Sequence, residues 1–185
     1  MILFILGGFL LAKLRGYKLL PALKEPLLFP LYLLEALYIF IQFSFIIGNH
    51  SLLNYANLLQ IGFIAVLILP IIKYAINLPA ILSTISVIIG SRLNALVMDA
   101  NGGLMPVFPT LSKLTQYYNT DSITTINDGK HILGSSETKL AFLADYIDIG
   151  WSILSPGDVL IHGFVTVIVF YTIKNINIKK SARKG

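Results

Sequence analysis

The sequence predicts an all-α integral membrane protein with about five transmembrane helices and one extracytoplasmic polar region before the last helix. Mean hydropathy is +0.78 over 185 residues. Hydrophobic residues make up 56% of the chain and charged residues only 12%, whereas soluble domains are about a quarter charged. The apolar residues also gather in five segments separated by polar ones. This length suits a single membrane domain over residues 1–185.

The first apolar segment covers about residues 1–12 and is short for a membrane span. Twelve helical residues are about 18 Å long, whereas the hydrocarbon core of a bilayer is about 30 Å thick. The cations Lys13 and Arg15 follow this segment, whereas a secretory signal carries its positive charge in front of the apolar residues. We therefore expect a retained segment that runs from the outside of the membrane to the inside.

Three further spans are expected before the polar region, over about residues 27–48, 58–72 and 80–98. Each is an apolar run bounded by polar or charged residues, and each is long enough as a helix to cross most of a bilayer. Glu35 lies inside the second span and Arg92 inside the fourth. Ionisable residues at such depths are rare and are usually paired.

The fourth span is expected to end in a group of residues that stop helices. The apolar run that contains Asn94 meets Asp99, and Asn101, Gly102 and Gly103 follow. Glycine readily adopts the positive φ with which many helices end, and the Met-Pro pair that comes next favours an extended chain. We interpret this stretch as the outer end of a membrane helix.

The extracytoplasmic region is expected to cover residues 99–157. Lys130–Leu133 and Thr138–Leu143 flank a Gly-Ser-Ser-Glu sequence, which predicts a short hairpin. Aromatic and apolar residues from Phe142 to Trp151 predict a segment at the membrane interface, where Trp and Tyr are enriched. The fifth span follows, over about residues 158–173.

The distribution of basic residues predicts the orientation. With the N-terminus outside, the inner side holds ten of the fourteen cations, namely Lys13, Arg15, Lys18, Lys24, Lys73, Lys174, Lys179, Lys180, Arg183 and Lys184. The outer side then holds Lys113, Lys130 and Lys139, and Arg92 lies within the bilayer. This asymmetry follows the positive-inside rule. We therefore expect a multi-pass protein of the cell membrane whose C-terminus is cytoplasmic.

Several classes of function are disfavoured by the composition and by the motifs. The net charge of +5 comes from cations beside apolar runs and not from a folded basic face, so nucleic acid is not an expected partner. The chain has no cysteine, and its three histidines show no metal-binding spacing. No phosphate-binding loop or nucleotide fingerprint is present, so we expect neither a metal nor a cofactor.

Glu35 and Arg92 are the first candidate functional residues. Counted at about 1.5 Å per helical residue, both lie near the middle of the bilayer, so they can pair. One interpretation is a structural ion pair that fixes the packing of two helices. The alternative is that they line a path for a polar substrate.

Asp158 allows two interpretations. Ser155-Pro156-Gly157-Asp158 has the pattern of a helix start, with a serine cap, proline in the first turn and an acid at the third position. Alternatively, Asp158 and Asp145 could share one proton and activate water, as paired carboxylates do in a partly dry site. His162 lies one helical turn after Asp158 and is expected to be a packing residue.

Three motifs stand out along the chain, namely N-G-G-L-M-P-V (residues 101–107), T-K-L-A-F-L-A-D (138–145) and S-P-G-D-V-L-I (155–161). They resemble those of a bacterial membrane family known as domain of unknown function 5317. The resemblance covers nearly the whole chain, including the short first span and the basic loop after it. Leu104 departs from the arginine common in the family, which puts an anion-binding role of that position in doubt. The resemblance carries no established activity.

A weaker resemblance is to lipoprotein signal peptidase, an outward-facing membrane aspartyl protease. Asp145 in L-A-D-Y-I-D and Asp158 in S-P-G-D-V-L-I are similar to its two catalytic acids. Its N-L-I-D-R motif has no equivalent here, and its N-x-G-A-A-F motif is echoed only by Asn101 and Gly103. The match covers about thirty residues by analogy alone.

Two functions from different classes therefore follow from the sequence. The first is a non-enzymatic membrane protein, embedded in the lipid bilayer, that presents its outer region to another membrane protein, a lipid or a peptide, or supports a membrane complex. The second is an outward-facing aspartyl membrane peptidase that uses Asp145 and Asp158.

Overall fold

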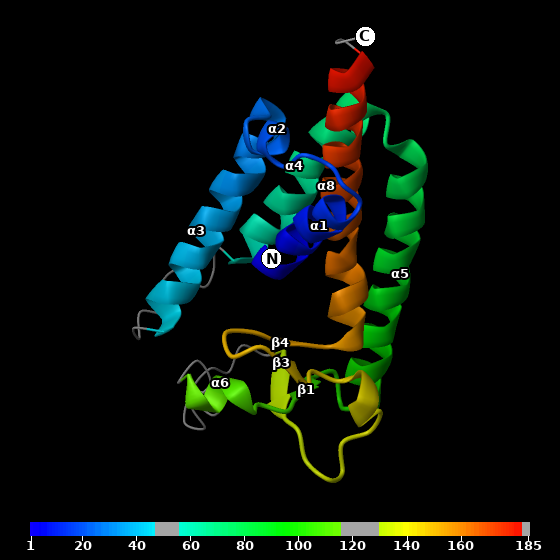
Figure 1. Cartoon of the computed structure of the whole chain (residues 1–185). Helices are drawn as coiled ribbons and strands as arrows, with labels where there is room; N and C mark the ends of the chain where they lie inside the picture. Colours follow the sequence, from blue (N-terminus) through cyan, green and yellow to red (C-terminus); the bar gives the residue numbers. More distant parts are fainter. Residues whose placement is uncertain (47–55, 116–129, 183–185) are drawn as a thin grey trace. The chain divides into compact units, whose positions relative to one another are not determined.

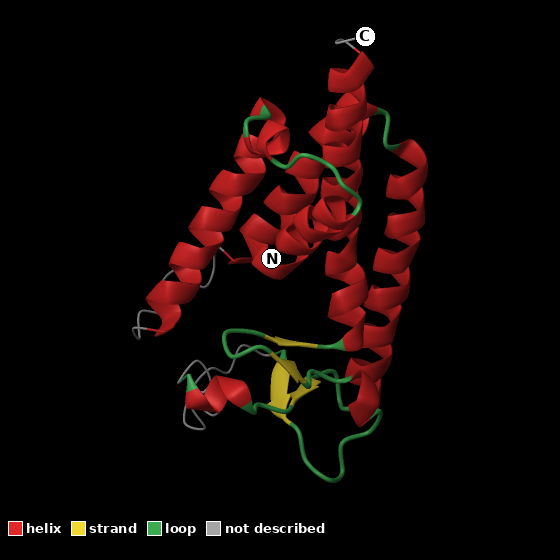
Figure 2. Cartoon of the chain, viewed as in Figure 1, coloured by secondary structure: helices red, strands yellow, loops and turns green. Residues whose placement is uncertain are grey.

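The computed structural model describes residues 1–46, 56–115 and 130–182, and these residues are mostly helical (Figure 1, Figure 2). The long helices are α1 (Ile2–Leu14), α3 (Phe29–Ile46), α4 (Ala56–Tyr74), α5 (Asn77–Ala100) and α8 (Pro156–Ala182). Short helical turns are α2 (Leu20–Leu23), η1 (Pro26–Leu28), α6 (Leu111–Leu114) and η3 (Ala141–Leu143). Four short strands are β1 (Met105–Val107), β2 (His131–Leu133), β3 (Ile147–Asp148) and β4 (Ile153–Leu154).

A helix lies at each of the five predicted spans. Among the described residues, three helical stretches are long and apolar enough to cross a membrane, namely Pro26–Ser44, Asn77–Ala100 and Pro156–Ala182. Two shorter apolar stretches in this part of the chain are α1 (Ile2–Leu14) and Ile61–Tyr74, which lies within α4. The helical class is therefore confirmed, whereas the number of five spans stays a prediction. Residues 47 and 48 of the second predicted span lie outside the described residues.

The last helix is longer than the predicted span over residues 158–173. α8 begins at Pro156 and continues through the basic residues to Ala182. The predicted end of the span rests on hydropathy, which drops at Lys174. Lysine and asparagine do not end a helix whose apolar side remains packed against other helices. Ile176, beyond the predicted end, is buried in the same cluster as Ile173.

The described residues form two compact units. Unit 1 contains Met1–Ile85 and His162–Gly185, and unit 2 contains Ser86–Ile161. Unit 1 is built from helices. Unit 2 holds the four strands and most of the predicted polar region (Figure 2).

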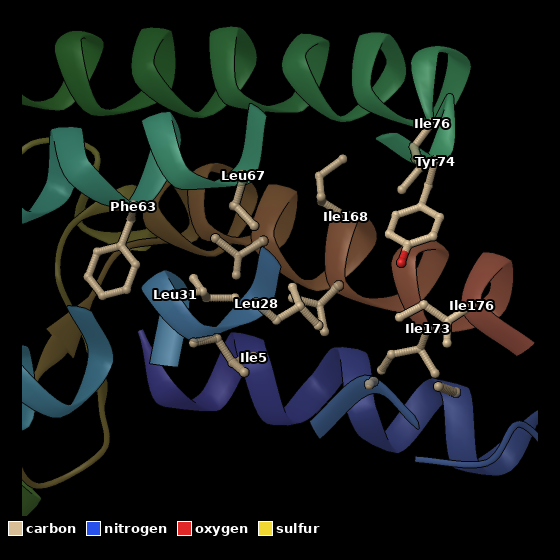
Figure 3. Close-up of a cluster of buried hydrophobic side chains, with 14 of the residues drawn as sticks. Ile5, Leu28, Leu31, Phe63, Leu67, Tyr74, Ile76, Ile168, Ile173 and Ile176 are labelled. Atoms are coloured by element: carbon tan, nitrogen blue, oxygen red, sulfur yellow. The ribbon is translucent and has the colours of Figure 1, made fainter. Parts of the chain in front are cut away.

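The core of unit 1 is an apolar cluster to which α1, α3, α4 and α8 contribute. Figure 3 shows Ile5 from α1 and Leu31 from α3 facing Leu67 from α4 and Ile168 from α8. Lipid is as apolar as these side chains, so close van der Waals packing would hold such a bundle together in a membrane.

A glycine and a threonine bring α1 and α8 together within unit 1. A Cβ atom on Gly8 would lie 2.8 Å from Val169 and 2.9 Å from the carbonyl oxygen of Thr166, so only glycine fits here. The Thr166 hydroxyl donates a hydrogen bond to the carbonyl oxygen of Phe4 at 2.8 Å. Small residues and hydroxyl bonds of this kind are common where membrane helices meet.

Within unit 2, α5 ends at the predicted helix stop. The Gly103 N–H donates to the carbonyl oxygen of Met98 at 2.8 Å, and Gly102 has φ +72°, which is a glycine-terminated helix end. The helix stop predicted at Asn101, Gly102 and Gly103 is therefore confirmed.

The predicted hairpin around residues 134–137 is wrong. β2 pairs with β1 in parallel, with Met105 opposite His131 and Val107 opposite Leu133, while residues 141–143 form the turn η3. The local sequence pattern could not indicate a partner 26 residues earlier in the chain. A hairpin does occur nearby, where β3 pairs antiparallel with β4 and Ile147 lies opposite Leu154.

Candidate functional site

The first turn of α8 packs tightly against α5 within unit 2. A Cβ atom on Gly157 would lie 2.6 Å from the carbonyl oxygen of Gly90 and closer still to the Oδ1 atom of Asn94. Glycine is therefore required at both Gly90 and Gly157 for the two helices to approach this closely. The close approach also brings Asn94 to the beginning of α8.

Asp158 closes the start of α8 through a reciprocal pair of hydrogen bonds. The Asp158 N–H donates to Ser155 Oγ at 2.9 Å, and the Ser155 N–H donates to Asp158 Oδ2 at 3.1 Å. This is a capping box, in which an aspartate replaces the usual glutamate, and it confirms the helix start predicted from the sequence. Caps of this kind stabilise a helix by about 1 kcal/mol.

Asn94 extends this cap into a small polar network. Its Nδ2 donates to the Oδ1 atom of Asp158 at 2.8 Å, and its Oδ1 accepts from the Ser155 hydroxyl at 2.8 Å. Both carboxylate oxygens of Asp158 therefore accept hydrogen bonds from fixed donors. This arrangement holds the side chain in one orientation.

Asp145 is a buried acid at the edge of the β1–β2 sheet. Its main chain extends the sheet, because its N–H donates to Pro106 at 3.0 Å and its carbonyl oxygen accepts from Phe108 at 2.7 Å. The residue is only 5% exposed, and its Oδ1 atom has no hydrogen-bond partner within the described residues. The Nε2 atom of His131 lies 3.8 Å from its Oδ2 atom, and the histidine side chain is 41% exposed.

Burial, together with the negative charge of Asp158, raises the pKa of Asp145 to about 8. Burial is the larger cause, because a carboxylate loses its hydration in an apolar setting. Asp145 therefore carries a proton at neutral pH, and its charge is coupled to that of Asp158. The charge of Asp158 thus affects the pKa of Asp145, but the environments of the two acids differ. Asp158 accepts hydrogen bonds at both carboxylate oxygens, whereas the Oδ1 atom of Asp145 has no hydrogen-bond partner within the described residues.

Asp148 has a different, structural role. Its Oδ2 atom accepts hydrogen bonds from the main chain and side chain of Ser112, at 2.9 and 2.7 Å, and from the Thr110 N–H at 2.6 Å. Its Oδ1 atom accepts from Gly150 at 2.9 Å. Although partial burial alone would raise the pKa of Asp148, these donors lower it below the ordinary value. Asp148 fastens the β3–β4 hairpin to the start of α6.

Asn101, Gly102, Gly103 and Asp99 are the remaining candidate residues of unit 2. Asn101 holds Lys139 through two hydrogen bonds, because its Nδ2 donates to the Lys139 carbonyl oxygen at 2.9 Å and its Oδ1 accepts from the Lys139 N–H at 3.0 Å. Gly102 and Gly103 both have positive φ and stand in open space. Asp99 is exposed. These contacts place Asn101 among the residues that shape unit 2.

Glu35 and Arg92 belong to different units, so their predicted pairing stays a prediction. Glu35 is 4% exposed in unit 1, and neither of its carboxylate oxygens has a hydrogen bond of ordinary geometry within the described residues. The amino group of Met1 and the N–H of Ile2 act on it electrostatically. Arg92 is exposed in unit 2.

His162 packs against Phe4 within unit 1. The two ring centroids are 5.3 Å apart, and the rings are tilted by 47°. This contact agrees with the expected role as a packing residue.

The sequence did not single out His131 as a neighbour of Asp145. The two residues are brought together because β1 pairs with β2 on one side and bridges to Asp145 on the other. Such a parallel arrangement of short strands leaves no local pattern. The one usable signal was the histidine beside an apolar pair in His131–Leu133, which is a weak strand pattern.

The chemistry available at this site is that of a protonated acid. A neutral Asp145 can donate one hydrogen bond and accept another, and His131 offers a second polar group at a more exposed position. Within the described residues, no group of three or more His, Asp or Glu side chains is arranged to hold a metal ion.

Comparison with known proteins gives a family but no activity. The sequence model of the family of unknown function DUF5317 matches residues 21–170. An uncharacterized protein from Thermotoga maritima is 37% identical over 92 residues, which are 46% of this chain and 48% of that protein. The chain thus aligns with about half the length of this relative. No solved structure matches the chain significantly.

Proposed function

The chain belongs to the DUF5317 family of unknown function, and we propose that it is a multi-pass membrane protein whose unit 2 faces outward and binds a partner without hydrolysing it. The membrane placement is supported by the three long apolar helices and by the positive-inside asymmetry. The partner expected is a polar segment of another membrane protein or a peptide.

A single observation carries the binding role, namely the buried Oδ1 atom of Asp145 without a hydrogen-bond partner among the described residues. A buried polar atom left unpaired costs about 1–3 kcal/mol. A partner group that bonds to this atom would recover that cost, and the more exposed His131 beside it provides a second contact.

The experiment is photo-cross-linking from the exposed position Ile132, beside His131, in living cells. We expect a discrete cross-linked product that Asp145→Ala abolishes and that the matched variant Asp99→Ala retains, because Asp99 is an exposed acid of the same unit. Equal cross-linking in both variants, or none in the unaltered protein, would refute the binding role. Protein abundance is measured in parallel, so that loss of folding is not mistaken for loss of binding.

The alternative is an aspartyl membrane peptidase that uses Asp145 and Asp158. It is supported by the effect of the Asp158 charge on the pKa of Asp145, since paired catalytic carboxylates have separated pKa values. We place it second because both oxygens of Asp158 serve the helix start and Asn94. Substrate processing that is lost in both Asp145→Asn and Asp158→Asn, at unchanged protein level, would favour the peptidase over the binding role.

A further inference from the structure

Two lysines meet over one tyrosine ring where α4 and α8 approach their C-terminal ends in unit 1. Lys73 Nζ lies 5.5 Å from the centroid of the Tyr74 ring, and Lys179 Nζ lies 4.9 Å from it. Lys179 Nζ also donates to the carbonyl oxygen of Lys73 at 3.3 Å. The ring itself is anchored, because Figure 3 shows it beside Ile173 and Ile176 of α8. Lys73, Tyr74 and Lys179 are called the lysine–tyrosine cluster below.

The charge of this cluster is only partly balanced. Lys73 Nζ forms an ion pair with the Oε1 atom of Glu25 at 2.7 Å. Although partial burial alone would raise the pKa of Glu25, hydrogen bonds from Lys73 and Tyr74 lower it, so the carboxylate is ionised at neutral pH. Lys179 forms no ion pair with a carboxylate within the described residues. One positive charge is therefore left over.

The sequence offers few other acids on this side of the molecule. In the predicted topology the inner segments carry ten cations, and Glu25 is their single acid. Lys73 and Lys179 are both exposed, so an anion from outside the chain can reach this unbalanced charge. In the inner leaflet of a bacterial membrane, the abundant anions at this depth are phospholipid headgroups.

We propose that the lysine–tyrosine cluster binds the phosphodiester group of an anionic phospholipid in the inner leaflet. The two ammonium groups would donate hydrogen bonds to the phosphate oxygens, and Tyr74 would sit at the headgroup level that tyrosine favours. This inference rests on the proposed membrane placement of unit 1. A simpler role, in which Lys179 only caps the carbonyl end of α4, makes no prediction about lipid.

The experiment is native mass spectrometry of the full chain in detergent, titrated with phosphatidylglycerol or with phosphatidylcholine of the same acyl chains. We expect preferential binding of phosphatidylglycerol. Lys73→Gln and Lys179→Gln should each weaken it about fivefold, and the double variant about twenty-fivefold. Glutamine keeps a hydrogen-bond donor while removing the charge. The matched control, Lys13→Gln, removes an exposed inner charge outside the cluster and should leave the binding unchanged.

Several results would overturn the proposal. Equal binding of the two lipids, or a loss in Lys13→Gln as large as in Lys179→Gln, would show that no specific site exists. A lower melting temperature in Lys179→Gln with an unchanged lipid preference would leave only the helix-capping role. Displacement of the lipid by inorganic phosphate at equal concentration would assign the site to free phosphate.

Failure of this inference is distinguishable from failure of the proposed function. A chain that fractionates with the membrane but shows no lipid preference would remove the lipid site alone. A chain that is absent from the membrane fraction would remove both.

Discussion

Replacing Asp145 by asparagine should remove a pH dependence from the stability of unit 2. In the folded protein the pKa of Asp145 is raised from 3.8 to about 8, chiefly by burial and further by the charge of Asp158. The folded state therefore holds a proton that the unfolded state releases. The stability that the neutral acid provides is fully present below about pH 4 and is lost as the pH rises to about 8.

The size of this effect follows from the change in pKa. Each pKa unit corresponds to 1.36 kcal/mol, so the full loss of stability between about pH 4 and pH 8 is up to about 6 kcal/mol. An asparagine has nearly the same shape as the neutral acid and does not ionise. The stability of Asp145→Asn should therefore stay nearly constant over this range and exceed that of the unaltered protein at pH 8.

The assay uses the single tryptophan of the chain, Trp151, which lies in unit 2. Denaturant unfolding of the purified protein is followed by Trp151 fluorescence at several values between pH 5 and pH 9. Asp99→Asn is the control, because it removes an exposed acid from the same unit and should keep the pH dependence. A flat profile in the unaltered protein, or an equally steep one in Asp145→Asn, would show that ionisation of Asp145 does not set the pH dependence.

Three further predictions concern helix packing and charge. Gly157→Ala should destabilise the protein by about 3 kcal/mol in thermal unfolding, because the new methyl group would clash with Gly90 and Asn94. The control Gly163→Ala has open space around its new methyl group and should be neutral or stabilising. Asp158→Asn should cost about 1 kcal/mol or less, since its amide oxygen can still accept from the Ser155 N–H, and a larger loss in thermal unfolding would contradict the capping role. Replacing Glu35 or Arg92 alone with glutamine should destabilise more than replacing both, and additive losses in a double-mutant cycle would show that they are not partners.

Features set by local sequence could be predicted. The apolar segments predicted the helices because a helix satisfies its own backbone hydrogen bonds, which a long apolar run favours. The glycines after α5 and the serine cap of α8 were found because both are signals within a few residues. α8 continues beyond the predicted span over residues 158–173, because hydropathy falls at Lys174 before the helix ends.

Features set by contacts between distant residues could not be predicted. The pairing of β1 with β2 and the approach of His131 to Asp145 depend on residues far apart in sequence, in strands of three residues each. The burial of Asp145 could not be predicted either. The sequence L-A-D-Y-I-D does not indicate that its first acid, Asp145, is buried, or that its second, Asp148, accepts several hydrogen bonds. The hydrogen bonds of Asn94 to the start of α8 required the close approach that Gly157 allows.

The protein is proposed to cross the membrane several times and to present unit 2 to the outside. Because the chain contains no cysteine, this orientation can be measured directly. Single cysteines are introduced at Ser136, an exposed residue of unit 2, and at Ser181, an exposed residue near the end of α8. Intact cells are treated with a maleimide that cannot cross the membrane. We expect labelling of Ser136→Cys in intact cells and labelling of Ser181→Cys only after the cells are opened. Labelling of Ser181→Cys but not of Ser136→Cys in intact cells would show that unit 2 does not face outward.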